Sequence, residues 1–155
     1  MHKRSNASEA CWQVEGDVIG YQFDHFAALG RFHQLTVDAY GAQHAGESAA
    51  AIGVAFALIG LRLSLDEGWD GDQVREAHRY LATTPKGWPT FTRSPGLPSV
   101  TALDVAMADS PEAHARAVER WAADAWAIWT PAQEEVIALI DARLPPEVRR
   151  RLRRR

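Results

Sequence analysis

Residues 47–66 read ESAAAIGVAFALIGLRLSLD, and this stretch decides the fold class. Large apolar residues recur at helical spacing, so Ile52, Phe56 and Ile59 share one face of an expected helix. A second face carries only small residues, which let a neighbouring helix approach closely: Ala49, Gly53, Ala57 and Gly60. The pattern predicts a central helix over 47–66 that packs tightly against another helix.

Helical spacing continues on both sides of this stretch, and no segment alternates as a half-buried strand does. We expect further helices over 17–29, 31–44 and 71–82, and two that begin near the prolines Pro111 and Pro131. The sequence therefore predicts an all-α fold, a compact bundle of four to six helices in a single domain over 1–155. The remaining parts are an N-terminal arm, a long loop rich in proline and glycine, and a basic C-terminal tail: 1–16, 83–99 and 145–155.

Length and composition restrict the class of protein. A chain of 155 residues can bury a core without a metal or disulfide. Cys11 is the only cysteine, which excludes an intramolecular disulfide and a four-cysteine zinc module. Residues 1–17 contain no apolar run of the kind found in secretory signals, and the uncharged stretch 48–61 is shorter than the roughly 20 residues of a membrane span. We expect a soluble, cytoplasmic protein of the bacterial type with no membrane partner.

Charge is distributed unevenly along the chain. The net charge is −3, but six arginines lie in 149–155. Without them, 11 basic residues face 20 acidic residues, a net charge of −9. Such a body repels phosphate backbones, so nucleic-acid binding could come only weakly and only from the tail. The alternative is a solvated end that does nothing beyond complementing a helix dipole.

The loop 83–99 is the one long irregular stretch between expected helices. Loops of this length in compact domains are usually functional or disordered, and Trp88 and Phe91 argue against disorder. Together with Arg93 they suit a cover over a binding site, to which Trp121 would contribute from the fifth helix. The alternative is an Ω-type loop packed over one end of the bundle.

Residues 32–44, FHQLTVDAYGAQH, place two imidazoles, a phenol and a carboxamide on one expected helix. His33 and His44 lie about 16 Å apart along a straight helix, too far to share one ion. Only Tyr40, Gln43 and His44 form a local cluster, and a second helix must complete a site. We expect that helix to be the fifth, with His114 facing the cluster.

Two kinds of chemistry fit these residues. Imidazoles from two helices and a carboxylate would hold zinc, iron or nickel, and the candidate ligands are His33, His44, His114 and Asp104. The candidate catalytic residues are His44 as base, Tyr40 as acid or oxyanion donor, Gln43 as orienting group and Asp38, or alternatively Asp104, as the partner that fixes an imidazole tautomer. The alternative is a buried hydrogen-bonded network with no chemical role.

The block from His33 to Tyr40, followed by Gln43, His44 and Gly46, resembles the signature of a small bacterial family of unknown function. Weaker similarity covers 100–105 and the stretch from His114 to Trp129. This chain has alanine at position 45, where the family usually has proline. The resemblance implies no reaction.

Two classes of function follow from the sequence. The first is a small-molecule enzyme or ligand-binding protein with a His/Tyr/Asp pocket between the second and fifth helices, compatible with a divalent metal and covered by the loop 83–99. The second is a non-catalytic helical interaction module, dimeric through the small-residue face of 47–66, in which the polar cluster is a structural network. Within the first class, the residues of the pocket fit an enzyme and a ligand-binding protein equally well.

Overall fold

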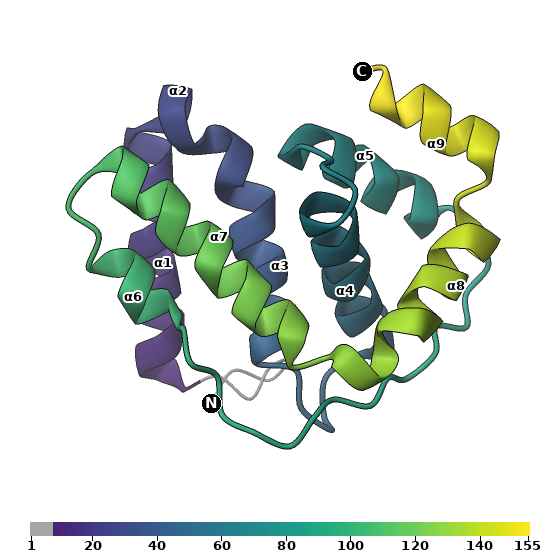
Figure 1. The fold of residues 1–155 in the computed structure, drawn as a ribbon, viewed down its shortest axis with the longest axis horizontal. Coiled ribbons are helices and arrows are strands. Elements are labelled where there is room, and N and C mark those ends of the chain that lie inside the picture. Colours follow the sequence, from purple (N-terminus) through teal and green to yellow (C-terminus); the bar gives the residue numbers. More distant parts are fainter. Residues whose placement is uncertain (1–7) are drawn as a thin grey trace.

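A computed structural model describes residues 8–155 and shows helices throughout, with no strand in that range. The elements in chain order are α1 (Glu9–Asp24), α2 (Phe26–Leu29), η1 (Gly30–Phe32), α3 (His33–Gln43), α4 (Ala51–Leu65), α5 (Gly71–Ala82), α6 (Ala102–Ala106), α7 (Pro111–Ala127), η2 (Thr130–Ala132), α8 (Gln133–Arg143) and α9 (Pro146–Arg153). The predicted all-α class is confirmed. Figure 1 shows α1 and α6 at one end of the molecule and α8 and α9 at the other.

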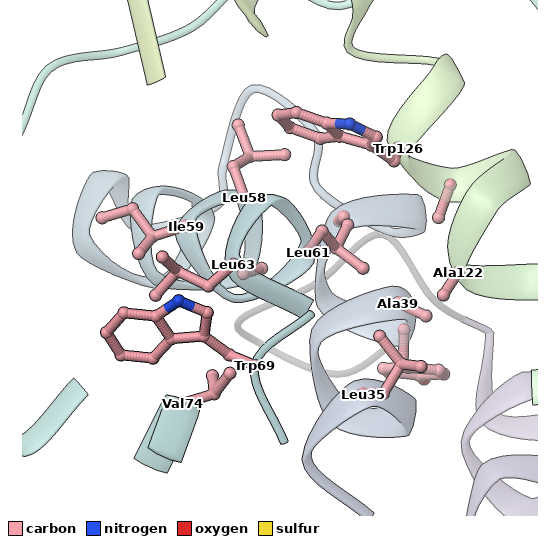
Figure 2. Packing of buried hydrophobic residues seen from close by; sticks show 14 of the residues in the cluster. Leu35, Ala39, Leu58, Ile59, Leu61, Leu63, Trp69, Val74, Ala122 and Trp126 are labelled. Carbon is pink, nitrogen blue, oxygen red and sulfur yellow. The ribbon is translucent and has the colours of Figure 1, made fainter. Parts of the chain in front are cut away.

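The core is built around α4. Leu58, Leu61 and Leu63 of this helix are completely buried. Figure 2 shows their neighbours, with Trp69 on one side of α4 and Trp126 on the other. Each buried leucine stabilises the fold by about 1.5–3 kcal/mol relative to an exposed one. The apolar run that decided the fold class therefore supplies the centre of the packing.

The small-residue face of α4 packs closely over only part of its length. Ala57 and Gly60 are buried against α3, where a Cβ on Gly41 would lie 3.4 Å from the Cβ of Ala57. Gly53, two turns earlier than Gly60, is exposed, and a Cβ added there would meet no atom within 4 Å. The expectation that the whole face is covered is wrong, because α3 ends at Gln43 and covers only the second half of α4.

More helices are present than the expected four to six, because the helix expected over 17–29 is divided into α1 and α2, and because α6 and α9 lie where no helix was expected. The expected arm is also helical in part. Within the expected arm over 1–16, α1 begins at Glu9, since the Ser8 side chain accepts a hydrogen bond of 3.2 Å from the Cys11 amide. That boundary was wrong for 9–16, and residues 1–7 lie outside the part that the structure describes.

The basic tail is not a solvated end. Pro146 starts α9, which buries Val148 and Leu152 and packs on α5. Arg149 forms ion pairs with Glu67, at 2.6 Å, and with Asp141, at 2.9 Å. The alternation of arginines with Val148 and Leu152 is therefore the pattern of an amphipathic helix.

The long irregular segment is slightly longer than expected and runs from 83 to 101. Arg143 of α8 fixes its first part by donating hydrogen bonds of 2.7 Å to the carbonyls of Pro85 and Gly87, while its guanidinium lies 4.1 Å from the centre of the Trp88 ring. Figure 1 shows the segment crossing from α5, along one edge of the molecule, to α6.

Candidate functional site

The second half of the irregular segment forms one wall of a cavity of about 530 Å³. The cavity lies between the start of α1, the end of α3 and the start of α6. Most of its lining is apolar, and the polar side chains that reach it are those of Gln43, His44, Arg93 and Thr101. The remaining lining residues are Ala10, Cys11, Val14, Gly96, Leu97, Pro98, Ala102 and Leu103. This size and character suit a small organic ligand.

Arg93 supplies the positive charge of the cavity. Its Nη1 donates hydrogen bonds to the carbonyls of Ala45, at 3.1 Å, and Gln43, at 3.3 Å, at the end of α3. Its guanidinium lies 5.9 Å from the centre of the Trp129 ring. No carboxylate within residues 8–155 forms an ion pair with Arg93, so its described partners are two carbonyls and the Trp129 ring.

His44 is the C-cap of α3 and the other ionisable side chain in the polar part of the wall. Its Nδ1 lies 3.0 Å from the Tyr40 carbonyl, which can only accept, so Nδ1 carries the proton. Burial lowers the pKa of His44, the hydrogen bond to Tyr40 opposes this shift, and the nearby Arg93 lowers the pKa further. The ring is therefore neutral near pH 7, with a lone pair on Nε2 that can accept a proton or a hydrogen bond.

Gln43 has a structural role beside the cavity. Its Nε2 donates to the Val100 carbonyl at 2.7 Å, and its Oε1 accepts a hydrogen bond of 3.0 Å from the indole of Trp121. The amide thus joins the end of the irregular segment to α7 through a fully buried tryptophan. Trp121 lies behind this amide and does not line the cavity, contrary to its expected role as a substrate-binding residue.

Trp88 and Phe91, the other expected substrate-binding residues, lie outside this cavity. Trp88 packs edge-on against Phe56, with ring centres 5.1 Å apart. Phe91 lines a neighbouring cavity of about 450 Å³, of which Arg93 is also a wall. Of the four residues, only Arg93 lies in the cavity beside His44, because Arg143 holds the first half of the segment against α8.

His114 does not face His44. It is buried near the start of α7, where its Nε2 lies 3.1 Å from Nε2 of Gln22, and the same Gln22 nitrogen donates to Thr36 Oγ1 at 2.7 Å. Thr36 is eight residues before His44, about 12 Å along α3. The expected convergence of the two histidines is wrong. His114 of α7 lies near the first turn of α3, at Thr36, whereas His44 follows the last turn of α3.

The expected metal ligands are also separated. Asp104 is exposed and accepts a hydrogen bond of 2.7 Å from the Thr101 amide, as the third residue of a capping box for α6. His33 lies at the start of α3 with its ring 5.4 Å from that of Phe23. Across residues 8–155, no three or more His, Cys, Asp or Glu side chains are grouped so that they could hold a metal ion. The four residues named as ligands therefore lie in different parts of the structure.

Asp38 and Tyr40 were expected to act beside His44. The Tyr40 ring does pack on that of His44, with centres 4.2 Å apart. Asp38 instead faces α4 and accepts a 3.1 Å hydrogen bond from Gln34. Burial raises the pKa of Asp38 well above its usual value, although the hydrogen bond from Gln34 lowers it. Asp38 is thus a buried acid whose environment favours the protonated form, and it does not line the cavity.

Comparison with known protein families gives one match. The family DUF5946, described as a family of unknown function, matches residues 2–130. The chain belongs to this family. Neither the curated proteins nor the solved structures include a match to this chain. The DUF5946 match agrees with the expectation of an uncharacterised family.

The DUF5946 match contains the whole cavity, since its lining residues run from Ala10 to Leu103. It ends at Thr130, before α8 and α9, so Arg143 and the α9 arginines lie outside it. No helix in the described part of the chain is both long and apolar enough to cross a membrane.

Sequence reasoning missed the part of the site that α1 contributes. Cys11 and Val14 line the cavity, and Glu15 follows Val14 on the buried side of the helix. Burial raises the pKa of Glu15 to about 7. The sequence does contain a signal for this part of α1. Four residues are spaced so that they fall on one face of a helix: Cys11, Glu15, Val18 and Gln22.

Proposed function

We propose that this DUF5946 protein binds a small amphiphilic carboxylate in the cavity beside His44. The apolar body of the ligand lies against the walls from α1 and α6, and its carboxylate meets Arg93. A single observation carries this proposal: a guanidinium without a carboxylate partner in residues 8–155 lines an otherwise mainly apolar cavity.

The physical reason lies in the donors that Arg93 retains. A guanidinium has five N–H donors in a fixed planar arrangement, and only Nη1 is bonded to described acceptors. A carboxylate accepts two parallel hydrogen bonds from such a group, and these charge-assisted bonds are stronger than neutral ones. The carbonyls of Gln43 and Ala45 fix the guanidinium before the ligand arrives, which lowers the entropic cost of binding.

The role of His44 distinguishes a binding protein from an enzyme. Its Nε2 lone pair is next to Arg93 in the same wall, so a bound acid with a second acidic proton could lose that proton to His44. The enzyme form of the proposal therefore assigns His44 the role of general base. The proposal assigns no step to a metal, and metal analysis of untagged protein checks this point.

The experiment compares octanoate with 1-octanol by isothermal titration calorimetry. The two share an apolar chain and differ in charge, so the parent protein should bind octanoate at least about tenfold more tightly, the value of one to two charge-assisted hydrogen bonds. Arg93→Met should abolish this preference while leaving octanol binding unchanged. Arg116→Met, which removes an exposed arginine of α7, is the matched control and should retain the preference.

Equal affinity of the parent for octanoate and octanol, or no binding of either, would refute the proposal. Arg93 also holds the irregular segment on α3, so melting temperatures of all variants must accompany the titrations. Arg93→Lys keeps the charge but not the planar pair of donors, and we expect it to retain part of the preference.

The second candidate, a non-catalytic interaction module, is favoured by exposed apolar side chains beside the cavity. Leu97 and Leu103 line the cavity and are exposed, as is Met107 of α6. Sedimentation velocity distinguishes the two functions. A monomer that binds one octanoate supports the ligand-binding function, whereas a dimer that dissociates in Leu103→Asp and binds no octanoate supports the module.

A further inference from the structure

The arginines of α9 fall into two groups. Three of them contact acceptors in other elements and help to hold the helix in place: Arg149, Arg153 and Arg155. The other three, called the outer arginines below, are exposed, and none forms an ion pair with a carboxylate of residues 8–155: Arg150, Arg151 and Arg154. Attachment of α9 to its neighbours therefore accounts for only half of these arginines.

The outer arginines lie on one side of α9. At about 3.6 residues per turn, Arg150, Arg154 and Arg151 span about 100° of the helix circumference, and Arg150 and Arg154 are about 6 Å apart along its axis. Val148 and Leu152 lie on the other side, where they are buried as α9 packs on α5. The apolar side thus fixes the helix and leaves a row of guanidinium groups facing solvent.

This arrangement costs stability. Arg150 and Arg154 are four residues apart and Arg151 and Arg154 three, so like charges are neighbours on the helix surface. The helix dipole offsets part of the repulsion, because cations are favoured in the last turn. Glu147, three residues before Arg150, lies on the same side and leaves a net charge of +2, from three arginines and one acid. A partner that neutralises the outer arginines would remove the remaining repulsion.

Phosphate groups are the anions that suit such a row. A guanidinium donates two parallel hydrogen bonds to a phosphate, and its planar arrangement of donors makes arginine better suited to this contact than lysine. A nucleic-acid strand carries its phosphates in series, one for each nucleotide, so a strand can meet arginines that follow one another along a helix. The outer arginines therefore fit a phosphate backbone better than a single small anion.

The charge of the remaining chain limits the kind of polyanion. Without the six arginines of 149–155, 11 basic residues face 20 acidic residues, a net charge of −9. Charges in solution act over about 10 Å at 0.1 M salt. A duplex or an anionic membrane is broad and would bring many negative charges close to this acidic body. A single strand can follow α9 alone, which Figure 1 shows at one end of the molecule, away from α1 and α6.

We infer that α9 binds single-stranded nucleic acid through the outer arginines, which contact its phosphates without reading its bases. Val148 and Leu152 stay buried, so α9 binds without leaving α5. Because α9 lies beyond the DUF5946 match, the inference concerns this chain and not the whole family. It is also independent of the carboxylate proposed for the first cavity, the one beside His44, which α9 does not line.

An oligo(dT) strand of about 12 nucleotides tests this inference by fluorescence anisotropy with the full chain. We expect binding at about 50 mM NaCl that becomes roughly 20-fold weaker at about 200 mM, the salt dependence of about three phosphate contacts on a single strand. An absence of binding at the lower salt concentration, or an affinity that does not change with salt, would overturn the inference.

Two double variants assign the contact to α9. Arg150→Gln with Arg154→Gln should weaken oligo(dT) binding at least about tenfold at low salt and lower the slope of log affinity against log salt by about 1.4. Arg116→Gln with Arg120→Gln is the matched control, because these arginines of α7 are also exposed and four residues apart. It should change the affinity less than about twofold. Equal losses in the two variants would show an effect of net charge and contradict a site on α9.

Three competing polyanions test the choice of partner: the duplex of oligo(dT) with oligo(dA), phosphatidylglycerol vesicles and polyglutamate. We expect each to bind more weakly than the single strand at the same salt concentration. Tighter binding of any of them would refute the inference and make duplex DNA, a membrane surface or an acidic protein the partner. Melting temperatures of both double variants should equal that of the parent, since glutamine is nearly as good a helix former as arginine.

Discussion

Asp38 occupies the space that any side chain at position 60 would need. An ideal Cβ on Gly60 would lie 1.9 Å from Asp38 Oδ2, far inside van der Waals contact. Asp38 is buried in α3 and cannot turn outward without losing its hydrogen bond from Gln34. Asp38 of α3 in this position therefore requires a glycine at position 60 of α4.

Gly60→Ala should destabilise the protein by about 1–3 kcal/mol, because the added methyl must displace a buried carboxyl. Gly53→Ala is the matched control in the same helix, where a Cβ meets nothing within 4 Å. It should stabilise by about 0.5–1 kcal/mol, the ordinary gain of alanine over glycine in a helix. Urea denaturation measures both. Equal effects of the two substitutions would show that α3 and α4 are not this close.

Glu15 should make stability depend on pH. Burial raises its pKa from 4.5 to about 7 in the folded protein, so between these values the unfolded chain loses a proton that the folded protein keeps. The free energy of unfolding must then fall as pH rises from about 4.5 to 7, by up to about 3 kcal/mol. Glu15→Gln removes this loss. The variant should match the parent near pH 4 and exceed it in stability at pH 7.

Denaturation curves at pH 4, 5, 6 and 7 measure this difference, and Glu119→Gln, at an exposed position of α7, is the control. Asp38 titrates in parent and variant alike, so its contribution cancels. A difference between Glu15→Gln and the parent that does not change with pH would refute the shifted pKa of Glu15.

Much of the fold could be predicted, because apolar spacing determines which residues are buried. The stretch 47–66 contains α4, and α5 and α7 begin where they were expected, at Gly71 and Pro111, capped by Asp70 and Ser110. The start of α1 was missed because its inner stripe there contains Glu15, a charged residue type that is nevertheless buried. The helix α9 was missed for a similar reason. Six arginines lie close to Val148 and Leu152 in the sequence, so its apolar face was not recognised.

The site was predicted in part, because the sequence shows the spacing within one helix but not the level at which two helices cross. His44 and Arg93 do line one cavity, and both were candidates. His114 was placed opposite His44 since both are on inward faces, yet α7 brings His114 to Gln22 and Thr36 instead. That offset depends on tertiary packing, which no pattern along a single segment records.

The C-terminal helix should contribute to stability. Leu152 and Val148 are buried between α9 and α5, so removal of 146–155 would expose their contact surface and break the Arg149 to Glu67 ion pair. We expect a loss of more than about 2 kcal/mol. Leu152→Ala should reproduce most of it, whereas Arg150→Ala at an exposed position should change stability by less than about 0.5 kcal/mol. An unchanged melting temperature after the truncation would contradict this prediction and support the interpretation of the tail as a solvated end.

The short stretch from Pro95 to Pro98 should close over a bound carboxylate. It is held on both sides, by the Ser94 amide on the Ile128 carbonyl at 2.7 Å and by the Ser99 and Val100 amides on Asp124 at 2.9 and 3.0 Å. Between these anchors, Leu97 lines the first cavity yet is 93% exposed, and Gly96 has a φ of 155° that few other residues adopt. A ligand gives Leu97 an apolar surface to cover. Octanoate should therefore slow hydrogen exchange of the Gly96 and Leu97 amides.

Leu97→Ala should leave the melting temperature nearly unchanged, since the side chain contributes little to the core. It should weaken octanoate binding by up to about tenfold, mainly through faster dissociation, because the apolar area buried on closure is lost. Stopped-flow dissociation and exchange followed by mass spectrometry measure the two effects, with Met107→Ala as the exposed apolar control. If the affinity of Leu97→Ala for octanoate equals that of the parent and amide exchange is the same with and without octanoate, this stretch does not move onto the ligand and Leu97 is only part of the rim.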